Sequence, residues 1–177
     1  MRNVWIASLG AAFLLAVNSV SAFAETGNGF LKADFKKEIA TPKLEKLLGV
    51  SGTLLLVSKQ EGALEAVGDD GKVTLTYPAK AGEETLLKQP EAIAIEGDTL
   101  YVVDSGSQQV VMYSFSTAKY LGKFGAKNGG LFGGDDNMLK SPQGVAVSEG
   151  VVYVADTDNA RIQLFGVNGV FMHTFEV

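Results

Sequence analysis

The sequence predicts an all-β protein built from repeated units of four short antiparallel strands. Three observations lead to this prediction: short apolar runs, turns rich in Gly and acidic residues between these runs, and an internal repeat at one fixed offset. The chain has 21 Gly, only 4 Pro and 46% hydrophobic residues, which is typical of a globular, turn-rich domain.

The first segment, residues 1–24, is expected to be an export signal. Arg2 precedes the apolar run Val4–Val17, and Ala22 and Ala24 fit the small-residue rule for cleavage before residue 25. The run has 14 residues, fewer than the roughly 20 that cross a bilayer as a helix. The chain also lacks Cys, so no disulfide or lipidated cysteine is available. We therefore expect an exported protein, periplasmic or secreted, without a stable membrane anchor after cleavage.

The mature chain is expected to be acidic. Removing residues 1–24 takes away one basic residue and leaves 14 basic against 20 acidic side chains, a net charge of −6. Affinity for nucleic acid depends on Lys and Arg that neutralise phosphates. Nucleic acid is therefore not an expected partner.

Residues 25–41 are a polar connector, in which Leu31, Ala33 and Phe35 alternate over too short a stretch to define a strand. The connector is either a disordered leader or an outer strand for a last repeated unit. The first unit, residues 42–86, is degenerate. Its leucines at 44–48 suit a strand or a helical turn, and its expected strands are 53–57, 64–68 and 73–77.

The second unit, 87–138, and the third, 139–177, are regular. Expected strands in the second are 92–95, 100–103, 110–115 and 120–124, and in the third 145–147, 151–155, 161–165 and 171–175. An ungapped offset of 52 positions relates the two units. It pairs Pro90 with Pro142, Ile93 with Val145, Tyr101 with Tyr153, Asp104 with Asp156, Val110 with Ile162 and Tyr113 with Phe165.

Repeats of about 40–50 residues, each with four antiparallel strands, predict a β-propeller. A single four-stranded sheet cannot bury both of its faces, whereas blades stacked around an axis cover one another. This stacking explains continuous apolar runs such as Val151–Ala155.

The third unit resembles an NHL repeat. The resemblance rests on Phe124-Gly125, Pro142–Val147, Val152–Thr157, Asn159, Arg161–Phe165 and Gly169. It implies a propeller of NHL-like blades, and more often an interaction scaffold than a defined activity. The chain departs from the family pattern at Ala160, where the family usually has His. Gln109 and Ala63 occupy the Arg161 position in the earlier units.

Four polar residues of the repeat are interpreted as turn clamps. Asp104 and Asp156 end the second strands, where a carboxylate can accept hydrogen bonds from turn N–H groups. Asn159 tolerates a left-handed conformation, and Arg161 can hold a carboxylate with two hydrogen bonds. The alternative is a cation site at Asp156, Asp158 and Asn159, but recurrence of the same position favours turn chemistry.

Asp135, Asp136 and Asn137 are the candidate binding residues. They lie in the Gly-rich loop 126–138, which is longer than its counterpart 79–85 and suits contact with a partner. Oxygen-rich loops can bind calcium, but the spacing matches no calcium loop, so no metal or cofactor is expected.

No catalytic residue is assigned. His173 is the sole His, too few for a three-His metal site, and the chain has no Cys nucleophile. The preferred function is a non-catalytic scaffold for a protein or small ligand. The alternative is a metal-assisted lyase or hydrolase with part of its site in absent blades.

About three blades are fewer than the four to eight of closed propellers. An open arc would expose two apolar faces. Three explanations stay open: an incomplete propeller, a homodimer that closes a six-bladed ring, or an arc completed by a different chain.

Overall fold

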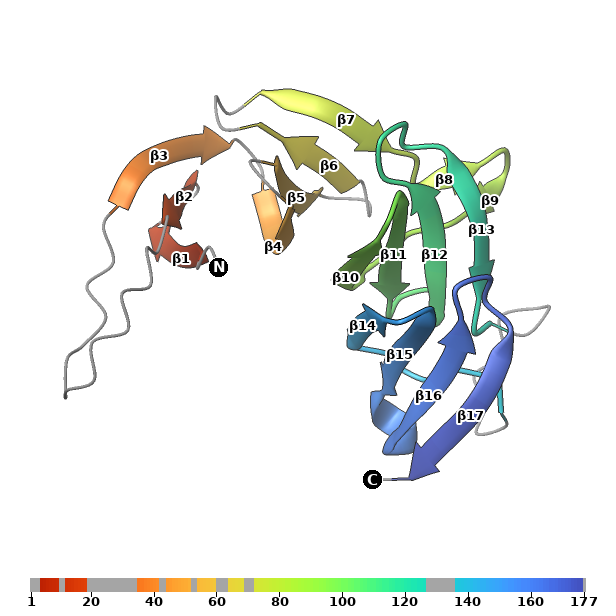
Figure 1. Cartoon of the computed structure of the whole chain (residues 1–177). Coiled ribbons are helices and arrows are strands. Elements are labelled where there is room, and N and C mark those ends of the chain that lie inside the picture. The colour runs from red at the N-terminus through yellow and green to blue at the C-terminus, as the bar shows by residue number, and fades with distance from the viewer. Residues whose placement is uncertain are drawn as a thin grey trace, which may run out of the picture.

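The computed structural model describes residues 4–9, 12–18, 35–41, 44–51, 54–59, 64–68, 72–126 and 136–176. It is an all-β structure in which successive antiparallel sheets follow one another along an arc (Figure 1). In these described ranges, no helix has the length and apolar character needed to cross a membrane.

Three four-stranded antiparallel sheets form the body of the arc, which confirms the predicted propeller-type fold. Each is a meander, with strands paired in chain order. Blade 1 contains β4 (Leu44–Ser51), β5 (Leu54–Lys59), β6 (Leu64–Val67) and β7 (Val73–Tyr77). Blade 2 contains β10 (Pro90–Glu96), β11 (Thr99–Asp104), β12 (Gln109–Ser114) and β13 (Tyr120–Phe124). Blade 3 contains β14 (Gly144–Ser148), β15 (Val151–Asp156), β16 (Arg161–Gly166) and β17 (Phe171–Glu176).

Two smaller sheets accompany the blades. A three-stranded sheet contains β1 (Val4–Leu9), β2 (Ala12–Asn18) and β3 (Phe35–Thr41), and a hairpin contains β8 (Lys80–Ala81) and β9 (Glu84–Thr85). The first two strands lie in the segment expected to be the export signal, and the third in the connector. The predicted cleavage site, Ala22–Ala24, and Leu31 and Ala33 lie outside the described residues. Cleavage therefore stays a prediction.

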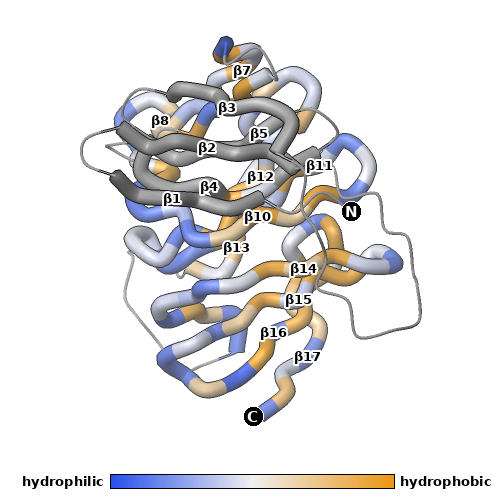
Figure 2. Tube along the Cα trace, turned by 90° about the vertical axis from the view of Figure 1, so that its left-hand side faces the viewer, coloured by the Kyte–Doolittle hydropathy of each residue, from blue (hydrophilic) through white to orange (hydrophobic). Residues whose placement is uncertain are grey.

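The blades are covered on both faces where they meet. All six residues of β12 are buried, because one side faces blade 1 and the other faces blade 3. Leu64, Tyr77, Leu100 and Val111 belong to the cluster between blades 1 and 2. Tyr101, Val110, Val152, Val154 and Phe165 belong to the cluster between blades 2 and 3. Figure 2 shows the hydrophobic residues along the neighbouring strands β10 and β14.

Buried tyrosines tie neighbouring blades together. The Tyr77 hydroxyl donates to the Phe115 carbonyl at 2.9 Å, and the Tyr113 hydroxyl donates to the Pro78 carbonyl at 2.8 Å. Their rings meet edge to face, with centroids 5.6 Å apart. Desolvation, with a smaller contribution from the negative charge of Asp98, raises the pKa of Tyr77 to about 12. Burial likewise raises the pKa of Tyr113.

Candidate functional site

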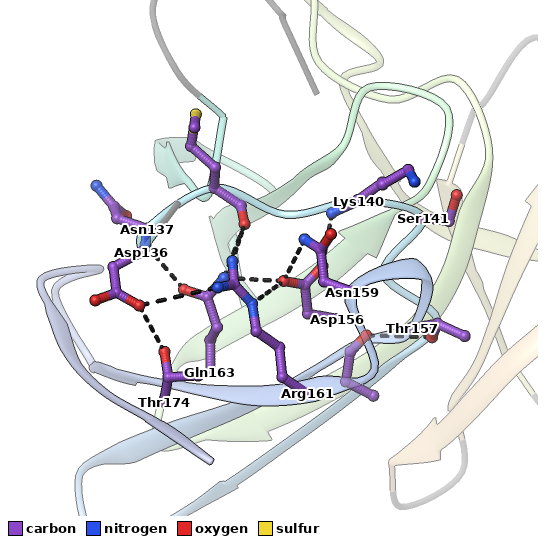
Figure 3. A network of polar contacts seen from close by, with 12 residues as sticks. Asp136, Asn137, Lys140, Ser141, Asp156, Thr157, Asn159, Arg161, Gln163 and Thr174 are labelled. Carbon is purple, nitrogen blue, oxygen red and sulfur yellow. Dashed lines mark hydrogen bonds and ion pairs between the residues drawn. The ribbon is translucent and has the colours of Figure 1, made fainter. Parts of the chain in front are cut away.

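The Asp156 carboxylate is the centre of a polar network at the end of β15 (Figure 3). It is fully buried. One oxygen accepts from the Lys140 backbone N–H at 2.6 Å. The other oxygen accepts from Asn159 Nδ2 at 2.9 Å and from Arg161 Nε at 2.7 Å. Asp156 therefore joins the start of blade 3 to the turn that follows β15.

Arg161 supplies the positive charge of this network. Its side chain is only 7% exposed, and its Nη2 donates to the Met138 carbonyl at 2.8 Å. Two buried ions stabilise a fold only when their hydrogen-bonding capacity is well satisfied, because both lose their hydration. The short Nε–Oδ2 contact and the main-chain carbonyl meet much of that requirement.

Gln163 is a member of the network that the sequence analysis did not select. It is fully buried on β16. Its Nε2 donates to the Met138 carbonyl at 2.8 Å and to Asp156 Oδ2 at 3.0 Å, and its Oε1 accepts from the Asn137 backbone N–H at 2.9 Å. A polar residue inside the apolar run from Ile162 to Phe165 was the available signal.

Blade 2 contains the same arrangement without the buried arginine, because Gln109 stands at the Arg161 position. The buried Asp104 carboxylate accepts from the backbone N–H groups of Lys88 and Gln89, each at 2.8 Å. It also accepts from the N–H of Ser107 at 2.7 Å and from its hydroxyl at 2.5 Å. Gln109, at the Arg161 position, donates to the Leu86 carbonyl at 2.8 Å. Lys88 and Leu86 correspond to Lys140 and Met138 at the offset of 52.

In the turn that follows β15, the residue with a left-handed backbone conformation is Ala160. The sequence had suggested Asn159 for this conformation. Asn159 ends the 3-10 turn η2 (Thr157–Asn159), and Ala160 follows it with φ 49°. Gln108, at the equivalent position of blade 2, has φ 58°. Ala160 and Gln108 adopt the left-handed conformation because each lies between a tight turn and the next strand. Asn159 instead uses its side chain to donate to Asp156.

Two of the three candidate loop residues contact the Asp156 network. Asp136 accepts from the Thr174 hydroxyl at 2.9 Å and lies 3.9 Å from Arg161 Nη1. The Asn137 N–H donates to Gln163, as described above. Asp135 lies outside the described residues. The described end of the loop is thus attached to blade 3 (Figure 3).

His173 lies apart from this network. It is exposed on β17, and its ring meets the Phe175 ring edge to face, with centroids 4.7 Å apart. Among the residues that the structure describes, no group of three or more His, Cys, Asp or Glu is arranged to hold a metal ion.

The Asp98 carboxylate ties the two turns at the opposite end of blade 2. It accepts from the Ser114 hydroxyl at 2.8 Å and from the Ser116 N–H at 2.9 Å. These hydrogen bonds favour the charged form and lower the pKa of Asp98. Its chemistry is therefore that of a turn clamp as well.

Comparisons with known proteins support the repeat and the fold. Residues 139–165 match the sequence model of the NHL repeat. A comparison with curated protein sequences found no match.

Several solved structures are similar in fold. The chain aligns with BamB from Moraxella catarrhalis at 14% identity and a TM-score of 0.56, covering 100% of this chain and 51% of BamB. It aligns with the WD40 repeats of RRP9 at 12% identity and a TM-score of 0.54, covering 71% of this chain and 36% of that one. Hydrazine synthase from Kuenenia stuttgartiensis aligns at 18% identity and a TM-score of 0.56, with coverage of 77% and 37%. The chain thus spans about half the length of BamB. It spans 36% of the RRP9 chain and 37% of the hydrazine synthase chain.

Proposed function

We propose that this chain, which carries an NHL repeat and folds as an arc of β-propeller blades, is an exported, non-catalytic scaffold that binds a protein or a small ligand. The observation that carries this proposal is how the polar groups of the repeat are used. Asp156, Arg161 and Gln163 are buried and bind one another and the main chain, so they hold blade 3 in shape. Asp104 does the same in blade 2.

Binding is assigned to the exposed surface of β17, the edge strand of blade 3. Apolar side chains are exposed around the β16–β17 turn and along β17, where Val170 is 60% and Met172 is 57% exposed. Exposed apolar groups that lie near one another are typical of contact sites. An outer strand also offers main-chain groups to a partner.

Export is supported by the N-terminal pattern alone and is tested by the N-terminus of the mature protein. Mass spectrometry of the processed chain should find Glu25 as its first residue. An N-terminus at Met1 in protein recovered from the cell interior would contradict export.

Site-specific photocrosslinking in living cells tests the scaffold function. A photoreactive residue at Met172 or Val170 should yield a specific crosslinked protein, whereas the same residue at the fully buried Val111 should yield none. Failure to crosslink at either exposed position would contradict partner binding by this strand.

Metal analysis separates the scaffold from the metal-assisted lyase or hydrolase. The purified protein should contain no stoichiometric metal. One zinc or calcium ion per chain, retained through dialysis, would contradict the simple scaffold and favour the enzyme.

A further inference from the structure

The turn between β16 and β17 contains an Asn-Gly pair, Asn168-Gly169, and hydrogen bonds hold it in place. The Gly166 N–H donates to the Val170 carbonyl and the Gly169 N–H donates to the Gly166 carbonyl, each at 2.8 Å. The Asn168 Oδ1 accepts from the Val170 N–H at 3.2 Å. Asn168 is exposed, so both water and a base have access to it.

Position 169 favours glycine on two grounds. Its φ is +80°, in the left-handed region that other residues rarely adopt. A Cβ at this position would lie 2.8 Å from Phe124 Cδ1 on β13 of blade 2. A larger residue would therefore strain the backbone and clash with the neighbouring blade. The residue that fits is also the one that shields its own backbone nitrogen least, because glycine has no side chain beside the amide.

Blade 2 holds this turn from outside. The Tyr101 hydroxyl on β11 donates to the Val167 carbonyl at 3.0 Å, and Tyr101 is only 1% exposed. The turn of blade 2 is held in a similar way, because the Tyr77 hydroxyl donates to the Phe115 carbonyl, 52 positions before Val167. That turn, residues 114–119, contains no Asn. Blade 3 thus combines a turn held by its neighbour with a reactive pair of residues.

Asn-Gly pairs lose ammonia through a five-membered ring. The Gly169 nitrogen gives its proton to a base and attacks Asn168 Cγ. A new N–Cγ bond forms, the Cγ–Nδ2 bond breaks, and ammonia leaves. Water then opens the succinimide. Cleavage of the N–Cγ bond leaves an ordinary aspartate at position 168, whereas cleavage at the original main-chain carbonyl leaves an isoaspartate, in which the main chain runs through Cγ.

The native turn favours one half of this reaction and blocks the other. The Val170 N–H donates to Asn168 Oδ1, the oxygen that gains negative charge as Cγ is attacked, so this donor is placed to stabilise that charge. The Gly169 N–H is occupied, because it donates to the Gly166 carbonyl. The nitrogen cannot lose its proton and reach Cγ until that bond opens. The reaction therefore depends on local opening of the turn.

We propose that Asn168 is a deamidation site and that the contact between blades 2 and 3 sets its rate. Opening of the turn separates the Val167 carbonyl from the Tyr101 hydroxyl, so this interface slows the reaction. The isoaspartyl product has one extra main-chain atom between Val167 and Gly169. The lengthened turn cannot keep both the Tyr101 bond and the close approach of Gly169 to Phe124. The reaction thus loosens the interface irreversibly.

This inference goes beyond the proposed scaffold function, because it concerns a covalent change in the chain rather than what the chain binds. The first test incubates the purified wild-type protein at one mildly alkaline pH, either folded in buffer or unfolded in urea. Peptide mapping by mass spectrometry follows aspartate and isoaspartate at position 168 over time. The folded protein should react at least about tenfold more slowly than the unfolded chain. Equal rates, or a folded protein that yields no product after prolonged incubation, overturn the proposal.

Matched tyrosine variants test whether the blade contact controls the rate. Tyr101→Phe removes the hydroxyl that holds the Val167 carbonyl, and it should speed the reaction of the folded protein by about two- to tenfold, the value of one neutral hydrogen bond. Tyr113→Phe is the control, because it removes a hydroxyl that donates to the Pro78 carbonyl, away from this turn. It should leave the rate unchanged. Equal acceleration by both variants would indicate global unfolding as the controlling step, and this result or an unchanged rate in Tyr101→Phe overturns the proposal.

The effect of the product on the interface has its own measurement. Asn28→Ser with Asn128→Ser leaves Asn168-Gly169 as the single Asn-Gly pair of the chain. The isoaspartyl form is separated from aged protein of this background by chromatography. Asn168→Asp in the same background is the control, because it supplies the new charge without the extra main-chain atom. In urea titrations the isoaspartyl form should have an unfolding equilibrium constant at least about tenfold larger than that of the control. Equal constants overturn the loosening of the interface.

Discussion

Replacing Asp156 with Ala should destabilise the protein more than replacing either of two other turn aspartates. The carboxylate accepts from Lys140 N–H and from the side chains of Asn159, Arg161 and Gln163. Its removal leaves a guanidinium that is 7% exposed without its closest anion. Removing one partner of a buried ion pair lowers the free energy of unfolding by about 3–5 kcal/mol. That is a large part of the 5–15 kcal/mol by which a typical domain is stable.

Asp104→Ala is the first comparison, because the arrangement is the same but the donors are neutral. It leaves backbone N–H groups and the Ser107 hydroxyl without their acceptor. It leaves no buried cation, so the expected cost is about 1.5–3 kcal/mol. Asp158→Ala is the second comparison. Asp158 is exposed and accepts from the Ser141 hydroxyl, so its loss should cost about 0.5 kcal/mol or less.

A double substitution tests whether the orphaned cation is the cause. Asp156→Ala combined with Arg161→Gln removes both charges and provides the residue that blade 2 uses as Gln109. The pair should recover at least about 1.5 kcal/mol relative to Asp156→Ala alone. Urea titrations give the free energies of unfolding. Far-ultraviolet circular dichroism is the probe, because the only Trp, Trp5, lies in the expected export signal and the processed chain would have no Trp fluorescence. A cost of Asp156→Ala no greater than that of Asp104→Ala, or no recovery in the double variant, would refute this explanation.

Three further predictions concern the turns and the buried tyrosines. Ala160→Gly should stabilise the protein by about 0.5–1 kcal/mol in the same urea assay, because Ala160 has φ 49° and glycine adopts this conformation without strain; a loss of stability would contradict this. Gly125→Ala should cost about 2–3 kcal/mol, since φ is +88° and a Cβ would lie 2.4 Å from Leu139 Cδ1. Gly150→Ala, with φ +78° and no atom within 4 Å, should cost only about 1 kcal/mol, and equal costs would disprove the steric argument. Stability should fall as pH rises from 10 to 12, because the unfolded chain loses the Tyr77 proton near 10.0 while the folded chain keeps it until about 12. Tyr77→Phe should flatten this fall in a series of urea titrations across the alkaline range, and an equally steep fall in the variant would exclude Tyr77 as its source.

The strands of blades 2 and 3 were predictable because two copies of one pattern support each other. Expected and observed bounds for β15 differ by one residue, at Asp156. Blade 1 has no close copy, and its leucines at 44–48 fitted two structures until pairing with β5 placed them in β4. The hairpin of β8 and β9 was missed, since two residues per strand carry no periodicity.

The polar network was predictable at its centre and not at its edges. A repeated acid at the end of a strand indicated Asp104 and Asp156 as candidates. Gln163 was missed because its counterpart in blade 2 is Val111, so the repeat gave no sign of a polar function. The attachment of Asp136 depends on Thr174, 38 residues away, and no local pattern indicates a contact over that distance. Exposure was also beyond the pattern, because Tyr101 and Tyr153 are equivalent in sequence, yet Tyr101 is 1% exposed and Tyr153 is 38% exposed.

The clamp of blade 3 has a consequence for how such chains lengthen. Asp156 and its donors Lys140, Asn159, Arg161 and Gln163 all lie within 24 consecutive residues, and the Met138 carbonyl is two positions before them. A DNA duplication that covers residues 137–163 also copies the Met138 carbonyl and the Asn137 N–H that bind Arg161 and Gln163. Each new unit would then arrive with its polar groups already satisfied, and only the apolar faces would have to match a neighbour. Growth by copying is therefore limited by the fit between faces rather than by the chemistry of the turns.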